Sequence, residues 1–267
     1  MPELPEVQTV LDGLQSVLDQ RVILGVECYY PGTVILDPDL DYEVFPTKVN
    51  KAVRRGKYML LHLDKDASLI VHLRMTGKLV YEASALEPHK HERARISLLG
   101  GDVIRFIDPR TFGKITLLKS DNLARFMPNL GPEPLSEDFN PEYLQSVLAE
   151  RNAPVKNLLL DQRLIAGLGN IYVCELLYRA KVLPDRAGKS INAREAKSIV
   201  KHTKEVLKEA LAVGGTSISD YRRIDDKTGE FQNFLKVYQK KECPKGHTMK
   251  NKRLGGRSSF YCPQCQN

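Results

Sequence analysis

The 267-residue sequence has no long apolar run, no basic leader segment and few cysteines. A membrane-spanning helix needs about 20 consecutive apolar residues, so we do not expect this chain to cross a membrane. The opening residues, MPELPEVQTV, contain two glutamates and no basic residue, and they do not resemble a secretory signal. Because the cytosol is reducing, the five cysteines should be thiols or metal ligands rather than disulfides. We therefore expect a soluble, cytoplasmic protein.

The composition is that of a folded protein with an excess of positive charge. Hydrophobic residues make up 42% and charged residues 27%, which excludes a largely disordered chain. The length is sufficient for one large domain or two ordinary ones. The net charge of +7 is compatible with an ordinary basic enzyme and with a nucleic-acid-binding protein. Only the distribution of this charge along the chain can separate the two.

The first half of the chain predicts one helix followed by β-structure. Apolar residues recur at helical spacing over residues 7–18. From about residue 20 to residue 120, short β-rich runs alternate with Gly, Pro or charged residues. This pattern favours antiparallel sheets in a sandwich or a barrel.

The second half predicts helices. Residues 130–143 contain three prolines and several acids, which is typical of a linker. Helices are expected at 154–161 and 170–180, and a third should begin after Asn192, with Glu195 at the capping-box position. The fold class is therefore α+β with two domains.

The C-terminal residues predict a metal site. Three of the five cysteines and one of the six histidines lie within 23 residues, as two pairs that 14 residues separate. The alternative, unrelated thiols near a terminus, explains this clustering less well than a closed tetrahedral zinc site does. The expected ligands are Cys243, His247, Cys262 and Cys265. We expect Cys28 and Cys174 to be buried, inert thiols.

Positive charge is concentrated in the same region. Residues 240–257 contain seven basic residues and a single acid, so they carry +6 of the net +7. A second cluster comprises Lys51, Arg54, Arg55 and Lys57. A solvated charged surface is the ordinary interpretation. A basic hairpin held by a metal, with Arg257 after two glycines, instead favours contact with nucleic-acid phosphates and an affinity that falls steeply with salt.

The N-terminus has the residue types of a nucleophilic site. Removal of Met1 would expose the secondary amine of Pro2, which can form an iminium with an aldehyde carbon. A position at a helix start favours the neutral, nucleophilic form of this amine. Glu3 and Glu6 follow on one helix face. Ordinary helix capping is the better explanation of these residues taken alone, so they do not establish the function by themselves.

Seven stretches of the chain resemble, in the same order, the formamidopyrimidine-DNA glycosylase family. Together they extend over the whole chain and are specific to that family. They are PELPEV at 2–7, RRGKY at 54–58, HLRMTGKL at 72–79, DPRTFGK at 108–114, GLGNIY at 167–172, GGTSISDY at 214–221 and GGRSSFYCPQCQ at 255–266.

The resemblance implies a domain organisation. An N-terminal catalytic β-sandwich domain with flanking helices would span residues 1–130, and a linker residues 131–143. A DNA-binding domain with a helix–two-turn–helix motif would span residues 144–237, and a zinc finger residues 238–267.

The resemblance also implies an activity: a bifunctional DNA glycosylase and abasic-site lyase of base excision repair. It would flip out oxidised purines, excise them through a Schiff base on Pro2 and cut the strand by β,δ-elimination. Glu3 would transfer protons and Lys57 would bind phosphate beside the reacting sugar. DNA contacts would come from His72, Met75, His91, Arg110, Phe112, Lys156, Asn170 and Arg257. Met75, Phe112 and Arg110 would fill the space that the flipped base leaves.

The implied partner is double-stranded DNA with oxidised bases or abasic sites. The implied protein is a monomer of the cytoplasm, associated with the nucleoid, with one structural zinc ion, no organic cofactor and no membrane contact.

Two positions depart from the family pattern. Gly246 stands where the family usually has a second zinc-binding Cys, so we expect His247 to take its place. Ser219 stands where many relatives have a basic residue, in the loop with Ser217 and Tyr221 that should cover the flipped base. This leaves the lesion preference open. The alternatives are an endonuclease VIII-type enzyme for oxidised pyrimidines and a catalytically silent DNA-binding zinc protein.

Overall fold

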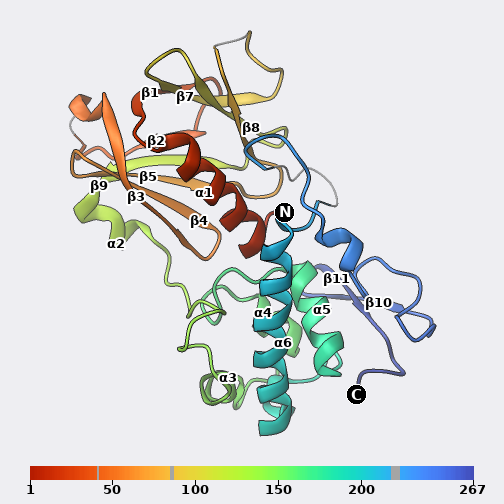
Figure 1. Ribbon diagram of the computed structural model, residues 1–267. Helices are drawn as coiled ribbons and strands as arrows, with labels where there is room; N and C mark the ends of the chain where they lie inside the picture. Colours follow the sequence, from red (N-terminus) through yellow and green to blue (C-terminus); the bar gives the residue numbers. More distant parts are fainter. Residues whose placement is uncertain (41, 85–86, 218–222) are drawn as a thin grey trace. The chain divides into compact units, whose positions relative to one another are not determined.

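The computed structural model describes residues 1–40, 42–84, 87–217 and 223–267 (Figure 1). Its packing divides the chain into two units. The first comprises Met1–Pro128 and Val213–Gln232, and the second Asn129–Ala212 and Asn233–Asn267. None of the helices in the described ranges combines the length and the apolar character that crossing a membrane requires.

The first unit is a β-sandwich. Its strands run in the order β2-β9-β5-β4-β3-β1-β7-β8-β6, and all pairs are antiparallel except β2 with β9. Only two residue pairs join β3 to β1, so the sheet folds there into two layers. The strands are β1 (Val22–Cys28), β2 (Val34–Leu36), β3 (Thr47–Arg55), β4 (Tyr58–Leu63), β5 (Ala67–His72), β6 (Lys78–Glu82), β7 (Glu92–Leu98), β8 (Val103–Ile107) and β9 (Lys114–Lys119).

One hydrophobic core fills the space between the layers. It combines residues of both, such as Leu61 and Leu69 with Leu79 and Ile96. Helix α1 (Leu4–Leu18) packs on β3 and β4 and buries one apolar face, as the helical spacing predicts: Val7, Val10, Leu11, Leu14 and Leu18. The expected sandwich and opening helix are thus confirmed. Short helices complete the unit: η1 (Tyr42–Val44), η2 (Ser120–Asn122) and α2 (Leu123–Phe126).

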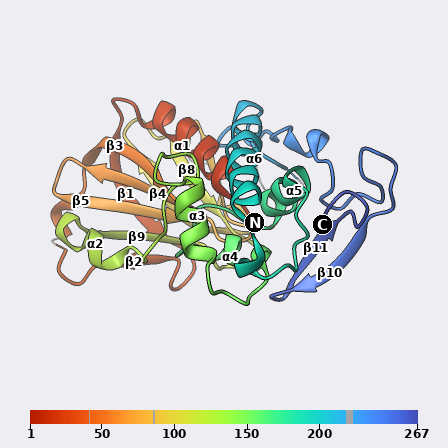
Figure 2. The same cartoon turned by 90° about the horizontal axis from the view of Figure 1, so that it is seen from below.

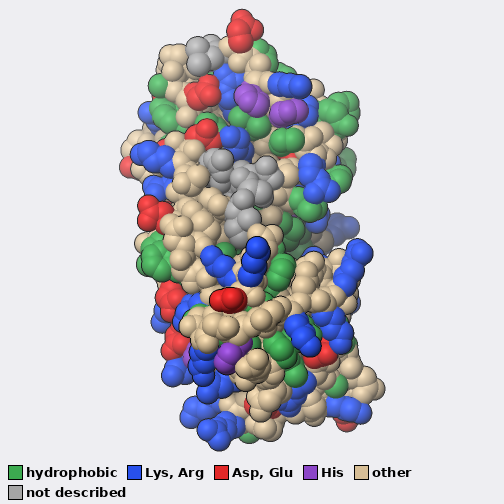
Figure 3. Space-filling view, turned by 90° about the vertical axis from the view of Figure 1, so that its right-hand side faces the viewer, with side chains coloured by type: hydrophobic (Ala, Val, Ile, Leu, Met, Phe, Trp, Pro, Cys, Tyr) green, Lys and Arg blue, Asp and Glu red, His purple; other side chains and the backbone are tan. Residues whose placement is uncertain are grey.

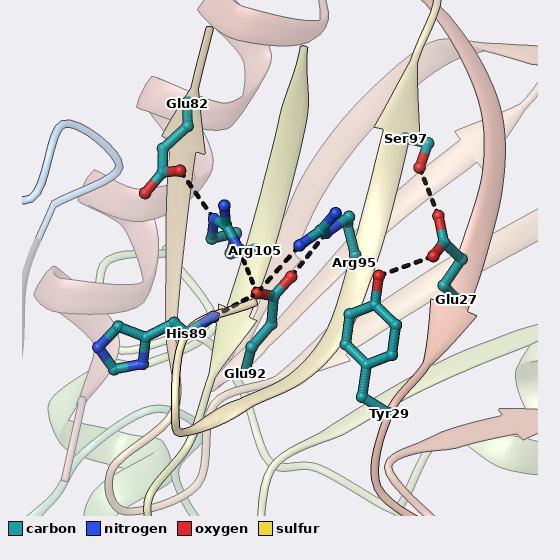
Figure 4. A network of polar contacts seen from close by, with 8 residues as sticks. All are labelled: Glu27, Tyr29, Glu82, His89, Glu92, Arg95, Ser97 and Arg105. Atoms are coloured by element: carbon teal, nitrogen blue, oxygen red, sulfur yellow. Dashed lines mark hydrogen bonds and ion pairs between the residues drawn. The ribbon is translucent and has the colours of Figure 1, made fainter. Parts of the chain in front are cut away.

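A buried polar network lies on β6, β7 and β8 (Figure 4). The fully buried Glu92 carboxylate accepts hydrogen bonds from Arg95 Nε, at 2.7 Å, and from Arg105. It also accepts one from the backbone N–H of His89, at 3.1 Å. Arg105 pairs in addition with Glu82, at 2.8 Å. The network therefore joins three strands to the turn that precedes β7.

The second unit contains four helices and a β-hairpin: α3 (Pro141–Leu148), α4 (Val155–Leu160), α5 (Asn170–Ala180), α6 (Ala193–Ala212), β10 (Lys250–Leu254) and β11 (Arg257–Tyr261). Figure 2 shows α5 beside α6, and β11 also packs on α5. Two 3-10 turns, η3 (Gly188–Ser190) and η4 (Phe231–Phe234), complete the elements.

The helix boundaries follow the sequence signals. The Asn192 side chain accepts the N–H of Glu195, and the Glu195 carboxylate accepts the N–H of Asn192, both at 3.0 Å. This capping box confirms the predicted start of α6. The proline-rich residues 131–143 belong to the second unit, where Phe139 is fully buried and α3 begins at Pro141.

The two remaining cysteines differ in their environment. Cys174 is buried in α5, as expected. The expectation for Cys28 is wrong, because Cys28 ends β1 and is exposed. The last residues of this strand extend past the core, and the thiol donates to the Tyr30 carbonyl.

Candidate functional site

Strand register brings most of the predicted DNA-contact residues of the first unit to one edge of the sandwich. Segments 73–77 and 108–113 both cross from one layer to the other at this edge. The segment before β7 and the turn before β4 end there as well. The pairs that establish this register are His72 with Lys114, Met59 with Val71, Lys78 with Ile107 and Glu92 with Ile107.

His72 ends β5 and is a neutral hydrogen-bond donor at this edge. Its Nδ1 accepts the backbone N–H of Arg74 at 3.0 Å, so the ring proton is assigned to Nε2. Its ring packs edge-on against Tyr58, with 4.4 Å between the centroids. Burial lowers the pKa of His72 to about 3, and repulsion from Arg74 and Lys57 adds to this shift. The ring therefore offers a donor without a charge.

Lys57 lies in the turn between β3 and β4, after Gly56, and its side chain is buried. It is close enough to His72 to contribute to the depressed pKa of that ring. Lys57, which was predicted to bind phosphate, and His72, which was predicted to contact DNA, are thus neighbours within one unit.

Met75, Arg110 and Phe112 lie on the two segments that cross between the layers. Met75 is 39% exposed and Phe112 49% exposed. The Arg110 guanidinium lies over the Phe112 ring, 5.0 Å from its centroid. Together they present apolar surface and a donor fork on exposed segments.

His91 precedes β7 and is half-buried. Its backbone N–H donates to Nδ1 of His89 at 3.1 Å, and its own Nδ1 lies 3.3 Å from Nη2 of Arg93. The His91 backbone is therefore held within a short turn that contains His89 and His91. The Glu92 carboxylate binds this turn by accepting the backbone N–H of His89.

The N-terminal residues are interlocked at the start of α1. Pro2 is buried and Glu3 is the N-cap residue. Glu6 Oε2 accepts the Glu3 N–H at 2.8 Å, and Glu6 Oε1 accepts the Thr216 N–H at 2.7 Å. Glu6 thus ties the Pro2–Glu3 segment to the end of the segment that begins at Val213. Our sequence-based site did not include Glu6, although its spacing from Glu3 is that of a capping box.

In the second unit, Lys156 and Asn170 converge on the β10–β11 hairpin. Lys156 is fully buried, and its ammonium donates to the Ser258 carbonyl at 2.8 Å and to Ser259 Oγ at 2.6 Å. The Asn170 side chain donates to the same Ser258 carbonyl at 3.0 Å. Arg257, the neighbouring residue of β11, is exposed. The two side chains therefore support the strand that presents Arg257.

The four predicted metal ligands come together. Their ligand atoms all lie within 4.8 Å of one another. Cys243 Sγ is 4.0 Å from Cys265 Sγ, and His247 Nδ1 is 3.2 Å from Cys265 Sγ and 3.6 Å from Cys262 Sγ. A tetrahedral zinc site with ordinary bond lengths separates such atoms by roughly 3.5–3.8 Å. These Cys3His residues therefore fit a tetrahedral metal ion.

The surroundings of Cys243 favour its thiolate form, whereas burial and the neighbouring thiols raise the pKa of Cys265. Burial disfavours the charged form of Cys243, but hydrogen bonds from the Lys245 and His247 backbone and from Tyr178 outweigh it and lower its pKa to about 7. The segment that leads into the cluster is anchored by the buried Glu175 of α5. Its carboxylate accepts the N–H groups of Lys236, Val237 and Tyr238, each at 2.9 Å.

The basic residues near the cluster are at the surface. Figure 3 shows Lys and Arg side chains gathered on the side that carries β10 and β11. Lys252 pairs with Asp185 at 2.7 Å. The exposed basic residues are Lys240, Lys241, Lys245, Lys250, Lys252, Arg253 and Arg257.

The predicted base-covering segment is only partly described. Ser219 and Tyr221 lie outside the described residues. The backbone N–H of Ser217 donates to the Gln232 side chain at 2.9 Å, and Ser217 Oγ accepts the N–H of Gly229 at 2.8 Å.

Comparisons with known families give two matches. Residues 1–115 match the formamidopyrimidine-DNA glycosylase N-terminal domain, and residues 130–222 match the formamidopyrimidine-DNA glycosylase H2TH domain. The chain is 42% identical over its whole length to a formamidopyrimidine-DNA glycosylase of Pelotomaculum thermopropionicum, of which it covers 99%. It is 39% identical to the protein of that name from Zymomonas mobilis, and the match covers both chains completely.

Solved structures agree with these matches. A Lactococcus lactis FPG mutant in complex with Fapy-dG-containing DNA has a TM-score of 0.92 at 33% identity, with both chains fully covered. Another Lactococcus lactis mutant, with Gly-His in place of one cysteine and bound to THF-containing DNA, has a TM-score of 0.92 at 32% identity, again over both full chains. The MutM (FPG) protein of Thermus thermophilus has a TM-score of 0.89 at 36% identity, over 99% of this chain and 98% of that one. With its fold, its motifs and its full-length relatives in agreement, this chain belongs to the formamidopyrimidine-DNA glycosylase family.

Proposed function

We propose that this protein excises oxidised purines, including 8-oxoguanine and formamidopyrimidines, from double-stranded DNA and then cuts the strand at the abasic site. Full-length relatives bear the name formamidopyrimidine-DNA glycosylase, and similar structures contain Fapy-dG or abasic-site DNA. One observation of this chain carries the proposal. Pro2 and Glu3 are held at the start of α1 by Glu6, in the unit whose edge presents Lys57, His72, Met75, Arg110 and Phe112.

Pro2 is the proposed nucleophile. After removal of Met1, its secondary amine attacks C1′ of the damaged nucleotide, and the bond from C1′ to the base breaks. The amine loses its proton, and the C1′–O4′ bond then breaks as O4′ is protonated, which opens the sugar ring and leaves an iminium between Pro2 and C1′. This iminium acidifies the C2′ proton. Loss of this proton expels the 3′ phosphate, and a second elimination expels the 5′ phosphate. A one-nucleotide gap remains.

Glu3 and Lys57 support this chemistry. Glu3 is almost fully buried, so its carboxyl group is shielded from water, and it protonates the sugar-ring oxygen and relays later protons. Lys57 and the neutral His72 donor bind the phosphate beside the reacting sugar. His91 contributes a further phosphate contact from the turn before β7.

The exposed side chains at the sandwich edge act on the DNA stack. Met75 and Phe112 fill the space of the extruded base, and Arg110 donates hydrogen bonds to the base that loses its partner. The partial exposure of Met75 and Phe112 supports this role, because their apolar surface is accessible to a bound duplex.

The second unit supplies phosphate contacts. Asn170 opens α5, where the positive end of the helix dipole favours anions. Arg257 follows Gly255 and Gly256, which adopt positive φ angles in the tight turn between β10 and β11. Lys156 was predicted to contact DNA directly; its buried hydrogen bonds support a role in holding this turn instead.

Zinc is the proposed metal of the Cys3His group, with His247 in the place of the usual fourth cysteine. The DNA complex of a Gly-His mutant of a relative is compatible with the natural Gly246–His247 pair. Bound zinc would fix the hairpin and take no part in bond-making.

We further propose a functional division into a catalytic domain at 1–130, a linker at 131–143, a DNA-binding domain at 144–237 and a zinc finger at 238–267. By packing, residues 131–143 belong to the second unit and residues 213–232 to the first. The protein would act as a monomer, in the cytoplasm at the nucleoid.

Borohydride trapping tests the proposal. Incubation with a duplex that contains 8-oxoguanine should yield a covalent protein–DNA adduct, and Pro2→Gly should abolish it. A duplex with an oxidised pyrimidine, run in parallel, should trap less protein. Stronger trapping on the pyrimidine substrate would favour an endonuclease VIII-type activity, and no adduct on either substrate would refute catalysis.

A further inference from the structure

Asp108 is a fully buried carboxylate between β8 and the segment that carries Arg110 and Phe112. Its Oδ1 accepts the Thr76 hydroxyl and, at 3.2 Å, the Arg110 backbone N–H. Its Oδ2 accepts the Gly113 N–H at 2.7 Å. One side chain therefore binds both segments that cross between the layers at this edge.

The backbone of Asp108 makes a third connection. Its N–H donates to the His91 carbonyl at 2.9 Å, and its carbonyl accepts Nε of Arg93 at 2.9 Å. The segment with Met75, the segment with Phe112 and the turn with His91 thus meet at a single residue.

The segment that carries Arg110 and Phe112 has an unusual backbone conformation. The Met75 and Phe112 side chains are 39% and 49% exposed. Thr111, between Arg110 and Phe112, has a φ of +60°, a conformation that non-glycine residues adopt rarely. The Gly113 backbone approaches Phe106 so closely that a Cβ would lie 2.4 Å from its ring. Such a segment needs hydrogen bonds, here those to Asp108 at its start, to keep a single backbone conformation.

The three hydrogen bonds that the Asp108 carboxylate accepts come from Thr76, Arg110 and Gly113, so this side chain joins segment 73–77 to segment 108–113. We propose that Asp108 is a positioning residue that holds Met75, Arg110 and Phe112 in one preformed arrangement for insertion into the DNA stack. This inference rests on the proposed function, because these three side chains enter the DNA stack only if the protein flips a base out of it.

Thr76→Val tests the inference, because valine keeps the shape of threonine and removes the hydroxyl donor to Asp108. Thr47→Val is the matched control, since the buried Thr47 makes the same kind of bond to Asp64 in the same unit. Two substrates separate flipping from chemistry. A duplex with 8-oxoguanine requires base extrusion, whereas a single-stranded oligonucleotide with an abasic site presents C1′ without it.

We expect Thr76→Val to slow single-turnover excision from the duplex roughly 10- to 100-fold, as small misplacements of positioned groups do. Borohydride trapping on the single strand should stay at the wild-type level. Thr47→Val should match the wild type on both substrates. In a Met75→Ala/Phe112→Ala background, Thr76→Val should add a smaller loss on the duplex than it does in the wild type, because only the part of its effect that passes through Arg110 remains.

Equal losses on both substrates would overturn the inference, and so would an unchanged duplex rate or a full additional loss in the double-variant background. Asp108→Asn is a second test variant, since asparagine preserves the shape of the side chain. We expect it to show the same loss of excision from the duplex with unchanged trapping on the single strand. A wild-type protein that traps neither substrate would refute the proposed function itself, a result distinct from a failure of Thr76→Val alone.

Discussion

Replacement of Glu92 by alanine should strongly destabilise the first unit. Glu92 is fully buried, and its carboxylate neutralises Arg95 and Arg105, of which only 10% and 2% of the side chain is exposed. Removing one partner of a buried ion pair costs 3–5 kcal/mol as a rule. Arg105 keeps its bond to Glu82, so we expect the lower end of this range, about 3 kcal/mol. For a unit of this size, that corresponds to a fall in Tm of about 10 °C.

Differential scanning calorimetry at neutral and acid pH measures this loss. Burial opposes ionisation of Glu92, but hydrogen bonds from Arg95, His89 and Arg105 outweigh it and lower its pKa below the ordinary 4.5. The stabilisation is therefore complete above pH 4.5 and is lost as the pH falls through the folded-state value, so wild type and variant should converge in acid. Glu27→Ala, which removes hydrogen bonds from Tyr29 and Ser97 at the surface, is the control and should lower Tm only slightly. A loss below about 1 kcal/mol for Glu92→Ala, or a gap that widens in acid, would contradict the reasoning.

Two further predictions concern the site. His247→Ala should release zinc, measured by a chromophoric chelator and by elemental analysis, whereas His247→Cys should retain it; full zinc content in the alanine variant would refute the Cys3His assignment. His72→Gln should keep most of the affinity for abasic-site DNA, because it retains a neutral donor, and His72→Leu should lower it by about tenfold. Because the pKa of His72 is lowered to about 3, wild-type affinity should show no step from this ring near pH 6.5. The contribution of the His72 ring to stability is present above pH 6.5 and is lost as the pH falls toward 3. An NMR titration in which the His72 resonances have a midpoint near pH 6.5 would contradict this.

Local signals in the sequence were sufficient for α1, α4, α5, α6 and the metal cluster, whereas α3 was not predicted. Asn192 and Glu195 predict the start of α6 because a capping box involves only neighbouring residues. The ligand spacing predicts the Cys3His group because the ligands of a zinc finger lie close in sequence. The position of Cys28 could not be predicted, since exposure at a strand end depends on where the core stops.

The contacts that support the site also could not be predicted from the sequence, because they depend on tertiary packing. Lys156 appears in the sequence as one more basic residue, and only the structure shows that its ammonium is buried and bonded to Ser258 and Ser259 of β11. Asp108 and Thr76 are 32 residues apart, and no periodicity links them. Glu92 meets Arg105 across two strands. Long-range pairings of this kind follow from sheet register, which the residue pattern alone does not specify.

The location of the trapped DNA on the protein tests the central claim most directly. Borohydride reduction of the reaction with 8-oxoguanine duplex, followed by protease digestion and mass spectrometry, identifies the bonded residue. We predict that the DNA remnant lies on the nitrogen of Pro2 and that Met1 is absent from that peptide. A remnant on a lysine, or an adduct formed by protein that retains Met1, would contradict the account.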